Sequence, residues 1–204
     1  MKDHKILTFE FEDLQHKNGY VNVCGIDEAG RGPLAGNVVA GAVIIPGGVS
    51  IEGINDSKKI SEKKRDELYD YITNNMIWSV AWASPEEIDE LNILNATMLA
   101  MHRALEKLPI KADFALIDGN CSRGFNIPTM TIIGGDGKSP SIAAASIIAK
   151  VTRDRQCLEL DEKFPEYGFR KHKGYPTKDH MDAVRRLGPC PEHRRSFLKF
   201  LDNE

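Results

Sequence analysis

Residues 21–45 read VNVCGIDEAGRGPLAGNVVAGAVII, and this stretch sets the architecture expected for the chain. Residues 21–26 and 38–45 are apolar and rich in β-branched side chains, which is typical of strands. The segment between them holds three glycines and one proline, a composition typical of a tight connection. The pattern therefore predicts a two-stranded hairpin, with Asp27 and Glu28 directly after its first strand.

The rest of the chain alternates strand-like and helix-like segments. Hydrophobic periodicity predicts strands at residues 77–83, 112–117 and 129–133, and helices at residues 61–73, 92–108 and 177–187. Ser84-Pro85 and Ser139-Pro140 each place a capping serine before a proline, so further helices should begin there, the second running on toward Phe164. This order predicts an α/β fold in which helices pack around a mixed sheet.

Length and composition fit one compact, soluble domain. The chain has 204 residues, of which 41% are hydrophobic and 28% charged, close to globular averages. The N-terminal segment interleaves charged with apolar residues, so we expect no signal peptide, no membrane span and a cytoplasmic location. The four cysteines lie apart without a CxxC pair, which favours reduced, mostly buried thiols over a zinc site or a disulfide framework.

Charge is unevenly distributed along the chain. The net charge is -3, yet residues 169–199 contain nine Lys or Arg against three Asp or Glu. Such an excess can follow a phosphate backbone or can be a solvated helix face, and both interpretations stay open. We interpret residues 1–165 as the main domain and residues 166–204 as a basic helical element packed on it.

Four carboxylates stand at the ends of predicted elements. Asp27 and Glu28 follow the first strand, Asp118 ends a later strand, and Asp136 precedes the long helix. Phosphodiester hydrolysis needs an activated water and charge stabilisation, which two Mg²⁺ or Mn²⁺ ions about 4 Å apart can supply when carboxylates hold them. Both later aspartates precede a glycine, as in ordinary turn dipeptides, so a turn is the alternative for each. Because neighbouring strand residues point to opposite faces, the first two acids can share a site only if the backbone turns there.

The glycine-rich connection permits one other interpretation. Gly30 to Gly36 loosely imitates a dinucleotide-binding fingerprint after a strand, with Glu52 near the position of a ribose-binding acid. The spacing is GxGxxxG, Pro33 stiffens the loop, and a strand-like run follows where the fingerprint demands a helix. A dinucleotide cofactor is therefore disfavoured.

Five segments of the chain resemble the ribonuclease HII family, in the order expected for it. They are GIDEAGRGPLAG at residues 25–36, INDSKKIS at 54–61, LIDG at 116–119, GDGKSPSIAAASIIAKVTRDR at 135–155 and HKGYPTKDH at 172–180. The resemblance covers essentially the whole chain. It implies a ribonuclease H-like fold, with a five-stranded mixed sheet flanked by helices and a helical C-terminal element.

The resemblance also implies an activity and a site. The activity is metal-dependent endonucleolytic hydrolysis of the RNA strand in RNA/DNA hybrids and at single ribonucleotides embedded in duplex DNA, 5′ of the ribonucleotide, leaving 3′-hydroxyl and 5′-phosphate ends. Asp27, Glu28, Asp118 and Asp136 match the family's catalytic, metal-binding acids, with Mg²⁺ or Mn²⁺ as cofactor. Gly30, Arg31 and Gly32 match the motif that senses the 2′-hydroxyl, and Tyr175 matches the tyrosine that packs on the sugar at an RNA-to-DNA junction.

Basic side chains are candidates for phosphate contacts. We expect such contacts from Arg31, Lys58, Lys150, Arg153, Lys171 and Lys173, although Lys150 and Arg153 could instead pair with an acid such as Asp154. His172, His180 and His193 are interpreted as surface or phosphate-facing side chains, because two-metal hydrolysis needs no imidazole. Asn37 departs from the family pattern, in which proline is commoner at this position.

The expected partners are RNA/DNA hybrid duplexes and DNA that contains ribonucleotides. We expect a monomer that acts away from membranes. The alternative function is a protein that binds hybrid duplexes without cutting them. The basic C-terminal segment could bind a hybrid duplex in an enzyme and in a non-catalytic protein alike.

Overall fold

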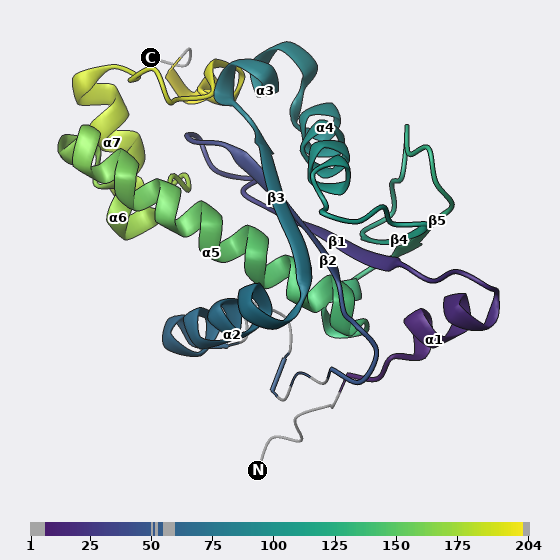
Figure 1. Cartoon of the computed structure of the whole chain (residues 1–204). Coiled ribbons are helices and arrows are strands. Elements are labelled where there is room, and N and C mark those ends of the chain that lie inside the picture. The colour runs from purple at the N-terminus through teal and green to yellow at the C-terminus, as the bar shows by residue number, and fades with distance from the viewer. Residues whose placement is uncertain (1–6, 50, 52, 55–59, 202–204) are drawn as a thin grey trace.

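The central sheet of the computed structural model has five strands in the order β3-β2-β1-β4-β5 (Figure 1). The structure describes residues 7–49, 51, 53–54 and 60–201. The strands are β1 (Val23–Ala29), β2 (Val38–Ile44), β3 (Ile77–Ala83), β4 (Phe114–Asp118) and β5 (Thr129–Ile132). β2 pairs antiparallel with β1 and β3, whereas β4 pairs parallel with β1 and β5. The predicted hairpin and the mixed five-stranded α/β sheet are therefore confirmed.

Helices cover both faces of the sheet (Figure 1). The α-helices are α1 (Glu10–Lys17), α2 (Glu62–Asn75), α3 (Pro85–Leu91), α4 (Ile93–Glu106), α5 (Pro140–Lys163), α6 (Phe169–His172) and α7 (Lys178–Leu187). The 3₁₀ helices are η1 (Gly135–Gly137), η2 (Pro165–Tyr167), η3 (Arg195–Phe197) and η4 (Lys199–Leu201). The predicted helix starts are confirmed, because the side chains of Ser84, Ser139 and Thr177 accept hydrogen bonds from backbone N–H groups in the first turns of α3, α5 and α7.

Helix α1 is an element that the sequence pattern did not predict. Its Glu12 is buried, and one carboxylate oxygen accepts hydrogen bonds from the Ser139 hydroxyl (2.7 Å) and from Ser141 N (3.0 Å). The carboxylate thus satisfies a backbone donor in the first turn of α5 and adds negative charge where the helix dipole favours it. Helix α1 therefore helps to fix the start of the long helix.

Helix α5 crosses one face of the sheet at close range, because glycines on the strands leave room for it. A Cβ on Gly25 would lie 2.1 Å from the backbone carbonyl carbon of Ser141, and a Cβ on Gly41 would lie 2.5 Å from the carbonyl oxygen of Ala145. The small residues of α5, such as Ala144 and Ala145, allow the approach from the other side. On the opposite face, α4 packs its buried Met101 into a core that includes Ile26 of β1.

The residues after α5 pack against the connection between β1 and β2. A buried cluster joins both regions, and its members are Leu34, Ala35, Leu160, Tyr167, Phe169, Ala183, Val184, Cys190 and Leu198. Residues on both sides of the predicted border at residue 165 share this cluster, since Leu160 of α5 belongs to it. The division of the chain at residue 165 stays a prediction. The cysteines are free thiols, with Cys24, Cys157 and Cys190 buried and Cys121 half-buried, as expected. Within the described ranges, no helix is both long and apolar enough to cross a membrane.

Candidate active site

Asp27 and Asp118 lie at the carboxyl ends of the neighbouring strands β1 and β4, and η1 with Asp136 is held beside Asp118. The two strands run parallel with Ile26 opposite Ile117, so Asp27 and Asp118 come next on neighbouring strands. One Asp118 carboxylate oxygen accepts a hydrogen bond from Gly135 N (2.6 Å), which holds η1 and its buried Asp136 at the same edge. Asp27 and Asp118 are thus brought close enough for their charges to interact, although about ninety residues separate them in the sequence.

Asp27 is a buried carboxylate surrounded by like charges. Only 4% of the residue is exposed, and Glu28 N donates a hydrogen bond to its Oδ1 (2.7 Å). Burial raises the pKa of Asp27 well above its usual range, and the charges of Glu28 and Asp118 raise it further, while a hydrogen bond with Ser146 of α5 opposes them. Negative charge therefore accumulates at this edge, which we call the acid edge (Asp27, Glu28, Asp118 and Asp136), and this environment favours a bound cation.

The backbone turn that would let Asp27 and Glu28 point to the same site is absent at these two residues. β1 continues through both residues, pairing Asp27 with Gly41 and Glu28 with Ala40, because its hydrogen-bonded ladder with β2 extends to Ala29. The chain turns only at Gly30, whose φ is +98°. Asp27 therefore faces α5, whereas Glu28 lies on the other face of the same strand end, 3.5 Å from the Arg31 guanidinium.

The acid edge fits a divalent cation in its donor chemistry. Hard ions such as Mg²⁺ and Mn²⁺ prefer carboxylate oxygens, and the raised pKa of Asp27 marks like charge that a cation would neutralise. Among the described residues, no three His, Cys, Asp or Glu side chains already converge as a metal-binding group. Asp118 is turned toward Gly135 N, so ligation would require carboxylates to rotate toward the ion. Metal binding by these four acids stays a prediction.

The structure brings the glycine-arginine-glycine segment and Tyr175 together. Gly30 is buried directly after β1, whereas Arg31 and Gly32 form an exposed tip. Tyr175 is 42% exposed, and its ring edge lies 3.7 Å from the position that a Cβ on Gly32 would take. An exposed aromatic ring therefore stands beside a backbone without side-chain bulk, one connection away from the acid edge.

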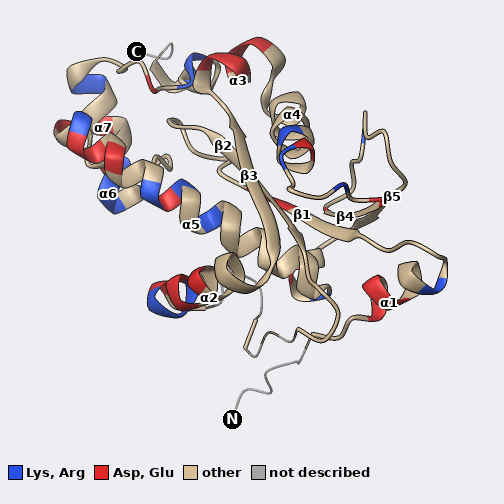
Figure 2. Ribbon diagram, in the orientation of Figure 1, with Lys and Arg blue, Asp and Glu red and all other residues tan. Residues whose placement is uncertain are grey.

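The candidate phosphate contacts lie in different environments. Lys150 pairs with Asp154 (2.7 Å) and Lys171 with Asp179 (2.6 Å), so these lysines already contact acids. Figure 2 shows this interleaving of basic and acidic residues along α5 and α7. Arg31 and Lys173 are at least partly exposed, and Lys58 lies outside the described residues.

Arg153 differs from the other candidates because it is buried. It is 1% exposed, and a Cβ on Gly30 would lie 2.1 Å from its Nε. A side chain beneath the β1–β2 connection is poorly placed for a direct phosphate contact, so we correct this expectation. Helical spacing alone could not reveal that this face of α5 lies under the connection.

The three histidines of the basic segment are buried, so the expectation of surface side chains was wrong. His172 is 7%, His180 0% and His193 2% exposed. The rings of His172 and His180 stack at 4.2 Å, and Phe169 packs against all three histidines. The charge of this segment concealed a small aromatic core.

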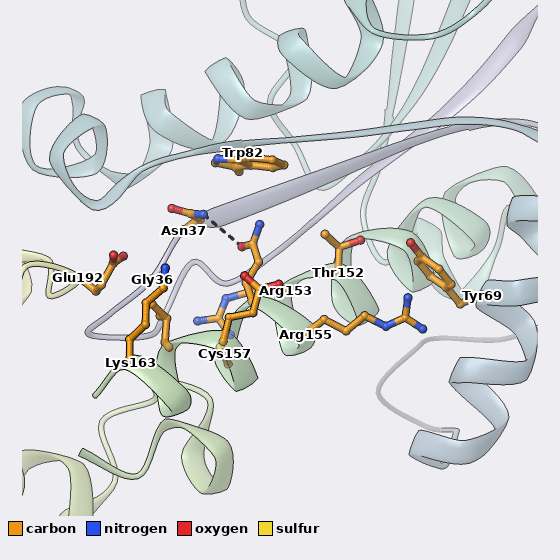
Figure 3. A pocket seen from close by; sticks show the side chains of 13 residues that line it. Gly36, Asn37, Tyr69, Trp82, Thr152, Arg153, Arg155, Cys157, Lys163 and Glu192 are labelled. Atoms are coloured by element: carbon orange, nitrogen blue, oxygen red, sulfur yellow. Dashed lines mark hydrogen bonds between the residues drawn. The ribbon is translucent and has the colours of Figure 1, made fainter. Parts of the chain in front are cut away.

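A cavity of about 460 Å³ lies between α5, β3 and the β1–β2 connection (Figure 3). None of the four acids lines it. Its lining includes Gly36, Asn37, Trp82 and Arg153. Asn37 Nδ2 donates to Gln156 Oε1 at 3.2 Å, so the residue that departs from the family pattern links the β1–β2 connection to α5. The cavity thus adjoins the back of the connection and does not contain the acid edge.

The amino-acid sequence matches one protein family over most of its length. The family model described as Ribonuclease HII matches residues 24–200. A ribonuclease HII of Dechloromonas aromatica is 57% identical over 176 residues, covering 86% of this chain and 90% of the relative, and one of Vibrio vulnificus is 50% identical over 191 residues, covering 93% and 92%.

Two solved structures share the fold over most of their length. The ribonuclease H2 of Pyrococcus horikoshii has a TM-score of 0.73 and 28% identity, covering 90% of this chain and 98% of that one. The ribonuclease HII of Archaeoglobus fulgidus, solved in a complex with PCNA, has a TM-score of 0.71 and 28% identity, covering 86% and 94%. The ribonuclease H-like fold expected from the resemblance is confirmed.

Proposed function

The chain belongs to the ribonuclease HII family and is a ribonuclease H hydrolase, and on this premise we propose that it cuts at single ribonucleotides in duplex DNA as well as within RNA/DNA hybrids. The cut lies 5′ of the ribonucleotide and leaves 3′-hydroxyl and 5′-phosphate ends. The observation that supports this most is the placement of the acid edge directly before the glycine-arginine-glycine segment, whose Arg31 and Gly32 form an exposed tip. One strand end thus offers both a place for charge stabilisation and a place for sugar recognition.

In this proposal Asp27, Asp118 and Asp136 hold Mg²⁺ or Mn²⁺ together with Glu28, whose side chain must reach the ion around the strand end because β1 does not turn between the two adjacent acids. A divalent ion at such a site activates water and stabilises charge on the attacking and leaving oxygens. Asp27 contributes a buried carboxylate in a setting of low dielectric, where its interaction with a cation is strong. Ser146 and Glu28 N orient that carboxylate by hydrogen bonds.

Substrate selection falls to the exposed tip and Tyr175. The 2′-hydroxyl is the group that distinguishes a ribonucleotide from a deoxyribonucleotide, and backbone N–H groups at Arg31 and Gly32 can approach it because neighbouring glycines carry no side chain. Tyr175 offers an exposed ring on which the next sugar can pack. Arg31 and Lys173 are at least partly exposed candidates for phosphate contacts, whereas Lys171 is exposed but already pairs with Asp179. All these residues come from one chain, so we propose a monomer.

A labelled DNA duplex with one ribonucleotide tests the proposal directly. Incubation with Mg²⁺ or Mn²⁺ should give a single cut 5′ of the ribonucleotide, and extension of the product by a DNA polymerase should show its 3′-hydroxyl. The matched all-DNA duplex should stay intact. Intact ribonucleotide strands with either ion would contradict the proposal, and salt-sensitive binding without a product would favour the non-catalytic alternative.

A further inference from the structure

The β1–β2 connection is held by segments far from it in sequence. Leu34 N donates to Gly174 O (2.8 Å), and Gly36 N donates to Glu192 O (2.9 Å). Arg194 N in turn donates to Leu34 O (2.8 Å), beside a bridge between Ala35 and His193. Residues 192–194 thus lie antiparallel beside the connection, joined to it by an isolated β-bridge at His193.

The Arg194 side chain completes this attachment. It is 0% exposed, and each of the five guanidinium N–H groups has a carbonyl acceptor in the connection. The bonds run from Nε and Nη2 to Gly36 O (2.9 and 2.7 Å), from Nη2 to Gly30 O (2.7 Å), and from Nη1 to Arg31 O (3.1 Å) and Pro33 O (2.8 Å). One buried cation therefore gathers the carbonyl groups from both ends of the connection.

These bonds determine the direction in which the backbone N–H groups of Arg31 and Gly32 point. Peptide bonds here are trans, so the C=O and N–H of one peptide unit point in opposite directions. Because Gly30 O and Arg31 O face Arg194, the N–H groups of Arg31 and Gly32 face away from it. In the described part of the chain neither N–H has a protein acceptor, which leaves two adjacent donors at the exposed tip.

The neighbouring side chain, His193, reaches Tyr175. Cys190 N donates to His193 Nδ1 (3.0 Å), so the ring proton of His193 sits on Nε2 and is donated to His180 Nε2 (3.0 Å). His180 then carries its proton on Nδ1 and donates it to Tyr175 O (3.0 Å). A chain of three hydrogen bonds, from Cys190 N through the neutral rings of His193 and His180, therefore holds the backbone carbonyl of Tyr175. We call His180 and residues 192–194 the C-terminal clasp.

We propose that Arg194 is a positioning residue for ribonucleotide recognition, and that the C-terminal clasp sets the tip donors and Tyr175 relative to each other. The inference rests on the proposed function, because it assigns the tip and Tyr175 to the sugar. Arg194 touches neither substrate nor metal in this arrangement. It acts by directing the N–H groups of Arg31 and Gly32 outward.

Arg194→Met tests this role, with Arg194→Lys as the conservative variant and Arg195→Met as the matched control. Arg195 has the same charge but is exposed and makes no bond to the connection in the described structure. Two quantities are measured: kcat/KM on the single-ribonucleotide duplex, and the ratio of Kd for all-DNA duplex to Kd for the ribonucleotide duplex without divalent metal. Circular dichroism establishes the temperature at which each variant is folded.

Arg194→Met should lower kcat/KM by about 10- to 100-fold and bring the Kd ratio toward one, because a displaced tip no longer meets the sugar. Binding to all-DNA duplex should change by no more than about twofold, since Arg31 is the only tip residue among the proposed phosphate contacts. Arg194→Lys should recover part of the Kd ratio, and Arg195→Met should match the parent protein.

Several results would overturn the role of Arg194. A folded Arg194→Met protein with the parent Kd ratio and kcat/KM would do so, as would equal losses in Arg195→Met. If Arg194→Met does not fold, a folded Arg194→Lys protein with the full Kd ratio would overturn it instead. Failure of the parent protein to cut any ribonucleotide duplex would instead refute the proposed function, so the two failures are distinguishable.

Discussion

Asp27 and Arg194 are both buried ionisable residues, yet their surroundings differ in kind. Burial and two neighbouring carboxylates disfavour the charge of Asp27. Burial also lowers the pKa of Arg194, to about 9, but five carbonyl hydrogen bonds surround its guanidinium, which stays a cation at neutral pH. The acid edge thus keeps a charge for an external partner to neutralise, whereas the C-terminal clasp uses its charge internally. The first arrangement suits chemistry and the second suits geometry.

Asp27→Asn should separate these two uses of charge most sharply. Removing the carboxylate charge while keeping its shape should lower cleavage of the single-ribonucleotide duplex at least about 10²-fold, because the cation loses a ligand. The same change should raise the melting temperature of the metal-free protein, since a buried like charge disappears. Cleavage kinetics and thermal unfolding in a chelator check both effects.

Asp70→Asn is the matched control, because Asp70 is an exposed acid on α2. It should leave both quantities unchanged. An Asp27→Asn protein that retains parent turnover would exclude Asp27 as an essential ligand. One that melts lower without metal would show that its charge is satisfied within the protein.

The two buried arginines sharpen the comparison further. Arg194→Met should lower the free energy of unfolding by about 3 kcal/mol or more, because several carbonyl groups lose a charged donor. Arg153→Met should cost no more than about 1 kcal/mol. Among the described residues, the Nε and Nη1 of Arg153 have no hydrogen-bond partner, and Nη2 makes one bond of 3.3 Å, to Ala35 O. Urea unfolding of both variants provides the measurement. Equal costs would mean that the bonds of Arg194 contribute no more than burial itself.

The acid edge could be predicted from the sequence because its signals are local. An apolar run ending in Asp27 predicts an acid at a strand end, and the same holds for Asp118. Parallel pairing then brings the strand ends together. The continued strand at Glu28 could not be predicted, because it depends on a ladder with β2 that reaches one residue beyond the acids.

The C-terminal clasp could not be predicted from local patterns. Arg194 and His193 lie in a segment whose net positive charge favours a solvent-exposed interpretation. The carbonyl partners of Arg194 lie about 160 residues earlier in the chain, and the partner of His193 is His180 on α7. Burial of polar side chains here depends on bonds to carbonyl groups of the connection, which no periodicity reports. The resemblance to the family included His180 and Tyr175 within a motif, but it did not indicate that His180 holds Tyr175.

Tyr175→Ala tests how much of recognition belongs to the ring itself. Loss of an aromatic platform should lower cleavage of the single-ribonucleotide duplex by about tenfold and weaken binding to all-DNA duplex by less. Tyr175→Phe should retain most activity. Tyr71→Ala is the matched control, because Tyr71 is similarly exposed (40% against 42%) but lies on α2. Equal losses in cleavage and in all-DNA binding would refute a junction-specific role.

The two regions should also respond to acid with opposite signs. Burial lowers the pKa values of His180 and His193 from 6.5 to about 4, so the unfolded chain binds more protons between these values and acidification destabilises the C-terminal clasp. The pKa of Asp27 is raised well above 3.8 in the folded chain. Between 3.8 and this raised value the folded chain binds more protons than the unfolded chain, so acidification stabilises the acid edge.

Urea unfolding of the metal-free protein between pH 7 and pH 4 measures the sum of these opposing contributions. His193→Gln keeps a donor toward His180 but removes one titrating group, so it should lose less stability on acidification than the parent. Asp27→Asn removes the opposing gain, so it should lose more. Identical pH profiles for all three proteins would mean that neither buried group titrates differently in the folded chain, and the contrast between the acid edge and the C-terminal clasp would then be one of geometry alone.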